Sequence, residues 1–286
     1  MGAKKNGPKK NKIVIVVLFV LGISLLLYPI VSNIVNSSSQ ALAIHNYKKE
    51  LKKIDEEERQ KEVEEAKRYN ESLKGTELSI EDPYSEEGSK ESKDETVGKT
   101  SPIDPKNIIG NVEIPRIGVE IPIYHGTSEL VLQKGAGHIE GTSLPIGGGG
   151  THTAITAHRG LPSSRLFRNL DKMKVGDEFY IHNMEGTIAY KVDSIDIVLP
   201  HETEKIAIND SKDYATLITC EPYMVNTHRL LVRGVRTEYI ADKDFKVSNQ
   251  IKRNLFYKYR DYIIVGALIL FAIIFIVRKR LVTRKN

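Results

Sequence analysis

The stretch Thr216-Leu217-Ile218-Thr219-Cys220 holds the only cysteine among the 286 residues of the chain. It is an apolar run with the composition of a β-strand, and Glu221-Pro222 directly after it marks a turn. Arg229 follows nine residues after Cys220, so a loop that returns the chain into an antiparallel strand would bring these two side chains together. Most unpaired cysteines are small buried hydrophobic residues. A lone thiol at a strand end near an arginine also suits a nucleophile, and the surrounding sequence has to decide between the two interpretations.

Short strands with turns between them extend outward from this stretch, from about residue 104 to about residue 238. Runs of β-type composition are separated by turns that contain Pro, Gly or Asn. The predicted strands are 108–114, 119–124, 153–158, 178–182, 187–197, 214–220 and 230–236. Segments 128–134 and 164–170 are predicted as single helical turns, and 135–138 as a tight turn. Seven or eight strands within about 135 residues predict a mainly β fold, a closed or nearly closed β-barrel.

Two apolar runs flank this region. Residues 13–35 contain no charged side chain, and they are long enough to cross a bilayer, which takes about 20 residues. Residues 262–277 form a run of only 16 residues. At about 1.5 Å per residue it spans roughly 24 Å, so its flanks must snorkel or the bilayer must thin around it. We predict two flanking transmembrane helices, 13–35 and 262–277.

The charge distribution predicts how these helices are oriented. Ten Lys and Arg residues lie in the tails 1–12 and 278–286, neither of which is acidic, so the rest of the chain carries −5 against +5 for the whole. Both basic tails are therefore expected in the cytoplasm, with the region between the spans outside the cell. The basic balance thus reflects contact with the lipid bilayer and not binding of nucleic acid. Ala41-Leu42-Ala43 resembles a signal-peptidase site but lies well beyond the apolar run, which favours an uncleaved anchor.

The segment 41–101 connects the first span to the barrel. Apolar residues recur at intervals of three and four from Ile44 onward among many Lys and Glu residues, which predicts a charged helix over about 41–74 that packs on the barrel or forms a stalk. Residues 75–101 are acidic and poor in apolar side chains, as in a mobile linker or loop. Asp82-Pro83-Tyr84 stands out in that loop. The barrel is expected over 102–240 and a juxtamembrane linker over 241–261.

A cysteine enzyme needs a thiolate, a proton donor for the leaving group and a group that stabilises the oxyanion. His158 is the best candidate for the donor, because it ends the predicted strand 153–158 at a strand-to-loop edge, where sites are commonly built. Structural roles are expected for four other histidines: His138, His152, His182 and His228. No cofactor or metal is predicted, since the acidic residues of 202–213 are not spaced as a recognised ligand loop.

Two other protein classes fit the sequence less well. Cysteine phosphatases also pair Cys with Arg, but they need a Gly-rich phosphate cradle with the arginine six positions after the cysteine. The loop after Cys220 has no glycine, and Arg229 lies too far along. A pilin or adhesin with a C-terminal anchor would carry Leu-Pro-x-Thr-Gly before Tyr262, and none is present.

At this point the residues resemble a known family. Thr-Leu-x-Thr-Cys ending at Cys220, the arginine at 229 and Thr156-Ala157-His158-Arg159 upstream are similar to the sortases of Gram-positive bacteria. Asp82-Pro83-Tyr84 is similar to the lid motif of class C, the pilus-assembling sortases. The second apolar run and the stretches 137–145 and 226–234 are also similar to that class. The resemblance implies a closed sortase-type β-barrel. Glu221 departs from the family pattern, and a carboxylate beside the thiol is expected to disfavour the thiolate.

The resemblance also implies roles for these residues. Cys220 would attack the Thr–Gly bond of an LPXTG-like sorting signal and form a thioacyl intermediate. His158 would protonate the departing amine, and Arg229 would bind the substrate carbonyls and the oxyanion. Asp82 would lie toward Arg229 and Tyr84 over Cys220 in the resting cleft. The implied partners are pilin subunits, one with the sorting signal and one with an acceptor lysine.

One alternative within the family stays open: a housekeeping sortase that transfers surface proteins to a cell-wall precursor. It would share the three catalytic residues, so those residues do not separate the two functions. The Asp82-Pro83-Tyr84 motif and the second apolar run favour pilus assembly.

Overall fold

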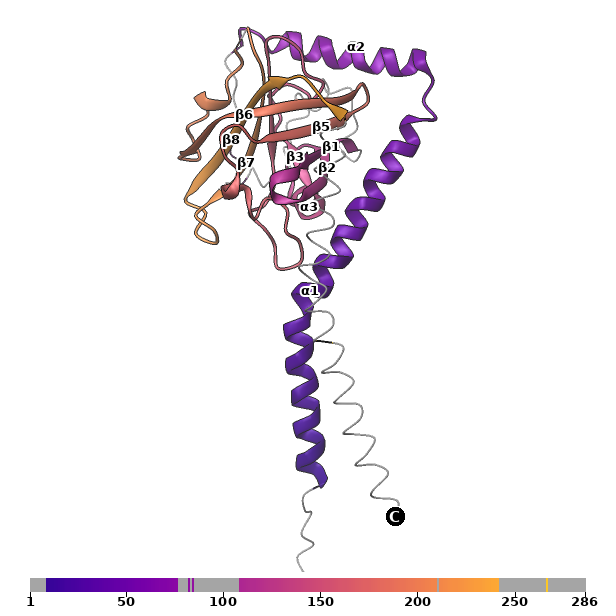
Figure 1. Ribbon diagram of the computed structural model, residues 1–286, viewed down its shortest axis with the longest axis vertical. Helices are drawn as coiled ribbons and strands as arrows, with labels where there is room; N and C mark the ends of the chain where they lie inside the picture. The colour runs from indigo at the N-terminus through magenta and orange to yellow at the C-terminus, as the bar shows by residue number, and fades with distance from the viewer. Residues whose placement is uncertain are drawn as a thin grey trace, which may run out of the picture. The chain divides into compact units, whose positions relative to one another are not determined.

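The apolar strands seen in the sequence close into a barrel in the computed structural model, which describes residues 9–76, 82, 84, 108–209, 211–241 and 266. The eight strands are β1 (Ile108–Ile114), β2 (Val119–His125), β3 (Ala136–His138), β4 (Thr151–Thr156), β5 (Glu178–Asn183), β6 (Gly186–Val198), β7 (Asp213–Glu221) and β8 (His228–Thr237). Their order around the closed barrel is β1-β2-β3-β4-β7-β8-β6-β5 (Figure 1). The prediction of a mainly β protein with a closed barrel of seven to eight strands is confirmed, with eight strands.

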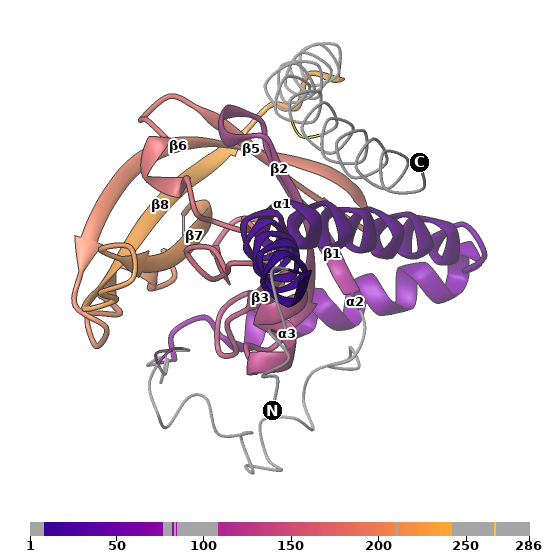
Figure 2. The same cartoon turned by 90° about the horizontal axis from the view of Figure 1, so that it is seen from below.

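The topology brings two strand ends together. Strands β4 and β7 are parallel neighbours, paired from Thr151 opposite Asp213 to Thr156 opposite Ile218. Strand β8 then returns antiparallel along the other edge of β7, and β6, β8 and β7 curve around one side of the barrel (Figure 2). The ends of β4 and β7 and the start of β8 therefore meet at one end of the barrel.

Strand β3 corrects the prediction of a tight turn at 135–138. The glycines allow its backbone to approach β2 and the loop after it. A Cβ added at Gly135 would lie 2.5 Å from the Pro122 carbonyl oxygen, and one added at Gly137 would lie 2.4 Å from the Gly126 carbonyl oxygen. No larger residue fits in either position. A composition that is typical of turns here serves close packing of two parallel strands.

The interior of the barrel is a continuous apolar cluster. It includes Val112, Ile123, Ile155, Phe167 and Leu217, which are all fully buried. The Phe179 and Tyr190 rings stack within it, with centroids 5.5 Å apart. Gly234 on β8 lies against this pair, since an added Cβ would approach the Phe179 Cε1 atom to 2.7 Å. The barrel is therefore a packed core, and its chemistry has to lie at its ends and on its outer face.

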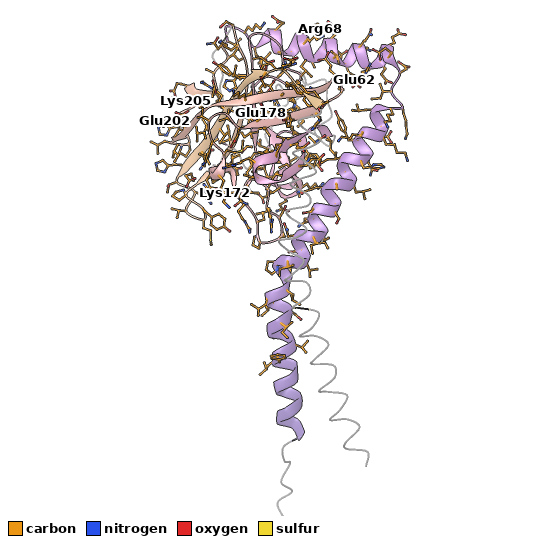
Figure 3. All side chains as sticks on the ribbon, in the orientation of Figure 1. Glu62, Arg68, Lys172, Glu178, Glu202 and Lys205 are labelled. Carbon is orange, nitrogen blue, oxygen red and sulfur yellow. The ribbon has the colours of Figure 1, made fainter. Side chains whose placement is uncertain are left out.

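Short helical elements connect the strands. They are η1 (Pro115–Ile117), α3 (Glu129–Lys134), η2 (Leu170–Lys172) and η3 (Glu204–Ile206). Helix α3 matches the predicted helical turn at 128–134. The turn predicted at 164–170 is wrong: Ser164 forms an isolated bridge with Leu161, turns follow, and the 3-10 helix begins only at Leu170. Charged side chains such as Lys172, Glu202 and Lys205 lie around these connections (Figure 3).

Two long helices precede the barrel, α1 (Lys9–Leu51) and α2 (Glu56–Ser72). The single charged helix predicted for 41–74 is therefore wrong. Its first part continues α1, and α2 starts anew after Asp55, whose carboxylate accepts a hydrogen bond of 2.8 Å from the Glu58 amide. An aspartate at this position caps a new helix and satisfies amides that would otherwise lack partners. Helix α1 carries a segment, Leu18–Leu51, long and apolar enough to cross a membrane.

The apolar stripe of these helices packs on the barrel. On α1, Ile44 is buried, and the Tyr47 hydroxyl donates to the Ile109 carbonyl oxygen at 3.2 Å. On α2, the Asn70 side chain bonds the Leu144 main chain in both directions, donating at 3.2 Å and accepting at 2.7 Å. Charged residues such as Arg68 occupy the exposed face of the same helix (Figure 3). The segment thus covers the barrel on the side of β1 and the β3–β4 connection.

The chain divides into two compact units, Met1–Tyr239 and Ile240–Asn286. Of the second unit, only Ile240, Ala241 and Gly266 belong to the described residues. The predicted linker 241–261, the predicted second span 262–277 and the basic tail 278–286 otherwise lie outside them, as do residues 1–8, Pro83 and most of the predicted loop 75–101.

Candidate active site

Cys220 and Arg229 face each other across the hairpin of β7 and β8. They are directly opposed in the antiparallel register, so their side chains leave the same face of the sheet. Both are buried, with exposed fractions of 4 % and 6 %. The loop between them turns tightly, as the amides of Val225 and Asn226 both donate to the Pro222 carbonyl oxygen. The spacing of nine residues predicted that the chain returns into an antiparallel strand, and this prediction is confirmed.

His158 reaches the same end of the barrel from β4. The pairing of β4 with β7 continues past the last strand residue, because the Ala157 amide donates to the Ile218 carbonyl oxygen at 3.2 Å. The Thr219 hydroxyl in turn donates to the Ala157 carbonyl oxygen at 2.8 Å. The residue directly before His158 is therefore tied to the residue directly before Cys220. The structure brings together all three predicted catalytic residues; their roles remain proposals.

The imidazole of His158 lies beside a carboxylate from helix α3. Its Nε2 atom is 3.6 Å from Glu129 Oε2, which is an ion-pair distance but too long for a hydrogen bond. Burial lowers the pKa of His158, and the charge of Glu129 acts in the opposite direction. Glu129 carries no local sequence signal for such a role. Only the placement of α3 across the barrel end brings it to the histidine.

Asp82 binds the guanidinium of Arg229 through both oxygens. The distances are 2.7 Å from Nε to Oδ1 and 2.6 Å from Nη2 to Oδ2, the bidentate geometry in which such pairs are strongest. The remaining terminal nitrogen of Arg229 donates to the Asn226 and His228 carbonyl oxygens. The guanidinium is therefore fully occupied by Asp82 and the main chain of its own loop.

Tyr84 lies between the predicted catalytic groups. Its ring centroid is 5.1 Å from the Arg229 guanidinium carbon and 5.6 Å from the His158 ring centroid. Its hydroxyl shares a hydrogen bond of 2.9 Å with the Thr156 hydroxyl. Burial raises the pKa of Tyr84, so the phenol stays neutral. The two described residues of the predicted lid motif thus contact Arg229 and His158.

The thiol of Cys220 is held in its neutral form. The pKa of Cys220 is raised to about 11, mainly by burial; the positive charge of Arg229 lowers it, the negative charge of Asp82 raises it, and the positive charge of Arg159 lowers it. Asp82 therefore disfavours the thiolate of Cys220 in two ways: through its own negative charge, and by pairing with Arg229, the cation that would stabilise a thiolate.

Arg159, next to His158, is a residue that the sequence interpretation passed over. It is only 9 % exposed, its Nη1 atom donates to the Cys220 carbonyl oxygen at 3.1 Å, and the same atom is paired with the Glu221 carboxylate. The Glu221 carboxylate, which was expected to disfavour the thiolate, therefore has a guanidinium as its partner. Two features of the sequence could have indicated this pair: an arginine directly after the candidate histidine and an acidic residue directly after the cysteine.

The other histidines have structural surroundings. His138 and His152 are buried, and each shares hydrogen bonds with a main-chain oxygen and a threonine hydroxyl. Burial lowers the pKa of both, to about 3 for His138 and about 4 for His152. His182 contacts Thr187 and Glu113 on the β5 side of the barrel, and His228 contacts the Thr227 hydroxyl. The hydrogen-bond partners of these four histidines thus lie away from Cys220.

Comparisons with known proteins agree with this geometry. A family model described as "Sortase domain" matches residues 112–237. Sortase C1 of GBS pilus island 1 is 45 % identical, with 71 % of this chain and 94 % of that chain covered and a TM-score of 0.62. Sortase C-1 from Streptococcus pneumoniae is 46 % identical, with 69 % and 98 % covered and a TM-score of 0.63.

A curated relative extends the same comparison. Sortase A of Bacillus anthracis is 30 % identical over 132 residues, which are 46 % of this chain, and the chain spans 61 % of the length of that protein. The residues that the family model matches, 112–237, include the hairpin that carries Cys220 and Arg229 and the strand that leads to His158. The chain belongs to the sortase family of cysteine transpeptidases, and its structural neighbours are class C sortases.

Proposed function

We propose that this chain is a membrane-anchored transpeptidase that joins pilin subunits through isopeptide bonds. The observation that carries the proposal is the contact of the lid motif with the predicted catalytic residues: Asp82 holds Arg229 through two hydrogen bonds while Tyr84 lies against His158. A site shared by all sortases accounts for the three catalytic residues. The lid residues and the likeness to sortase C proteins, one of them from a pilus island, favour pilus assembly over transfer to a cell-wall precursor.

The first half of the reaction forms a thioester. The thiolate of Cys220 attacks the carbonyl carbon of the Thr–Gly bond in an LPXTG-like sorting signal, and the electron pair of the carbonyl moves onto oxygen. Arg229, released by Asp82, stabilises this oxyanion with its fixed cationic fork. Protonated His158 donates its proton to the departing glycine amine. The C–N bond breaks, and the acyl group stays on the sulfur of Cys220.

The second half transfers the acyl group to an acceptor. The amine of a lysine on another pilin subunit attacks the thioester, and His158 accepts the proton that this nitrogen loses. The C–S bond then breaks and returns the thiolate of Cys220. The product is an isopeptide bond between two subunits, and the proton count of the site is restored.

The resting site has to change before it reacts. With the pKa of Cys220 raised to about 11 and that of His158 lowered, the neutral thiol and the neutral imidazole dominate near pH 7. Departure of Asp82 and Tyr84 removes a carboxylate from the thiol and frees Arg229. Opening of the lid is therefore both the uncovering of the cleft and an electrostatic activation of the nucleophile.

The proposal includes a location. Helix α1 anchors the enzyme in the membrane, both basic tails lie in the cytoplasm, and the barrel lies outside the cell, where it meets pilins delivered with uncleaved sorting signals. The second span, 262–277, is part of this proposal on the basis of the sequence.

The decisive experiment uses the full chain in membranes with candidate pilins. Wild-type protein is expected to give high-molecular-weight pilin ladders, and mass spectrometry of the ladders to locate an isopeptide bond at a lysine. Cys220→Ala should abolish the ladders and leave the thermal unfolding transition in place. Ladders that persist in Cys220→Ala would contradict the assignment of the nucleophile, and products linked only to a cell-wall amine would favour the housekeeping function.

A further inference from the structure

A buried ion pair lies directly behind the proposed nucleophile, on residues that the proposed reaction does not use. Arg159 and Glu221 pair across the ends of β4 and β7, and both are largely buried, with side-chain exposed fractions of 9 % and 19 %. The second terminal nitrogen of Arg159 lies 3.7 Å from Asp171 Oδ1. A buried charge is costly to leave uncompensated, so each partner fixes the state of the other.

The pair also continues the pairing of the two strands. Beyond Thr156 and Ile218 the links alternate between the chains: Ala157 amide to Ile218 carbonyl, Thr219 hydroxyl to Ala157 carbonyl, then Arg159 Nη1 to Cys220 carbonyl at 3.1 Å. His158 thus has a tied residue on each side of it along the chain. Its own carbonyl oxygen accepts from the Phe167 amide at 3.1 Å.

The charged and titratable groups around Cys220 come from five segments. They are Arg229 from β8, Glu221 from β7, Asp82 and Tyr84 from the lid motif, His158 and Arg159 from the segment after β4, and Asp171 from η2 behind Arg159. Arg229 is bound by Asp82 in the resting site. Arg159 is the cation that stays beside Cys220 whether or not the lid motif is in place, since its partners lie on β7 and at Asp171 and not on the lid.

We propose that Arg159 is a positioning residue for the proposed nucleophile, which fixes the main chain of Cys220 against the His158 segment and neutralises the charge of Glu221. The inference rests on the proposed function only in calling Cys220 the nucleophile. Without Arg159, the thiol loses a nearby cation and the carboxylate of the adjacent residue Glu221 is left without its guanidinium, so the thiolate becomes harder to form. Without Glu221, the guanidinium acts on the thiol unopposed, and the thiolate becomes easier to form.

The test measures the thiol directly, without a pilin substrate. Cys220 is the only cysteine of the chain, so alkylation of the full-length protein in detergent by iodoacetamide reports this residue alone. Rates are measured against pH for wild type, Arg159→Gln, Glu221→Gln and the double variant. We expect the midpoint of the Arg159→Gln profile to rise by about one pH unit, that of Glu221→Gln to fall by less, and that of the double variant to return toward wild type.

A purely structural role would not give opposite signs in the two single variants. Equal shifts in the same direction, or a wild-type profile in a folded Arg159→Gln protein, would overturn the proposal. If Arg159→Gln fails to fold, Glu221→Gln and Arg159→Lys keep the test open, because lysine retains the charge and should hold the midpoint near that of wild type. Cleavage of a sorting peptide, measured in parallel, separates the two ideas. The expected alkylation pattern without any cleavage would leave Arg159 in its role and contradict only the proposed function.

Discussion

At the scale of single residues, the state of the site depends on whether the two arginines near Cys220 are paired with carboxylates. Arg229 has one buried carboxylate partner, Asp82, and Arg159 has another, Glu221. Both cations lower the pKa of Cys220, yet burial outweighs them and holds the thiol neutral. The resting state is therefore stable and unreactive at the same time, since the groups that would activate the nucleophile are engaged in pairs.

Asp82→Asn should activate the thiol. The change keeps the shape of the side chain, removes the charge that raises the pKa of Cys220 and weakens the hold on Arg229, so the pKa falls and the thiolate fraction at a given pH rises. A shift of one pH unit corresponds to about tenfold faster alkylation at neutral pH. Asp82→Ala and Tyr84→Ala should also speed alkylation by a bulky maleimide, because they uncover the cleft.

Asp193→Asn is the matched control. Asp193 forms a similar two-bond pair with Arg233, at 3.0 and 3.1 Å, between β6 and β8. Its loss should leave the alkylation of Cys220 unchanged. Unchanged rates in all three lid variants would mean that the segment around Asp82 is an ordinary loop.

At the scale of elements, the strands that have a local sequence pattern were predicted correctly, whereas features that depend on packing between distant segments were missed. Strand β1 was predicted at its observed bounds, and six further strands within two residues at either end, because alternation and turn residues are local signals. Strand β3 was missed because its glycines serve a close approach to β2. The break between α1 and α2 was missed although Asp55 is a good capping residue. The pairing of Arg159 with Glu221 spans 62 positions, and no local pattern encodes it.

Gly234→Ala should destabilise the barrel. The added Cβ would lie 2.7 Å from Phe179 Cε1 and 2.9 Å from Tyr190 Cβ, so the stacked rings in the core would have to move. Overpacking of this kind costs about 1–3 kcal/mol, which should appear as a lower melting temperature in a thermal scan. Gly149→Ala, where an added Cβ meets nothing within 4 Å, is the control. Equal melting temperatures for the two variants would contradict the close approach.

The contacts of helix α1 should support the loop that follows His158. The Asn36 amide donates to the Ser163 carbonyl oxygen at 2.8 Å, and the Gln40 amide donates to the Lys134 carbonyl oxygen, at the end of α3, at 3.0 Å. Helix α3 carries Glu129 and the loop follows His158, so α1 contacts the segments next to both residues. Each hydrogen bond contributes about 1 kcal/mol.

Asn36→Ala with Gln40→Ala should therefore speed amide exchange in the loop around Ser163 by about fivefold or more. Hydrogen exchange with mass spectrometry on the full chain measures this directly. Ser38→Ala is the control, because the Ser38 hydroxyl bonds only the Ile34 carbonyl oxygen within α1. If exchange around Ser163 were the same in the double variant and in the control, α1 would be an anchor without influence on the site.

At the scale of the whole molecule, the proposed membrane anchor and the support of the site are one element. Helix α1 runs without a break from Lys9 to Leu51, so the apolar run 13–35 continues into the residues that contact the barrel. Asn36, which donates to the Ser163 carbonyl oxygen, directly follows that run. The catalytic end of the barrel is therefore expected close to the outer surface of the membrane, where pilins still held by their own membrane anchors would present their sorting signals.

The single cysteine allows the topology to be tested cleanly. In a Cys220→Ala background, new cysteines are placed one at a time by Asn11→Cys and Asn286→Cys in the basic tails and by Lys191→Cys on the exposed side of β6. A membrane-impermeant maleimide applied to whole cells should label the β6 position and neither tail, because both tails follow the positive-inside rule. Labelling of the Asn286 position in intact cells would place the C-terminus outside and exclude the second span. Detergent lysis should make all three positions reactive, which shows that each cysteine is present and accessible.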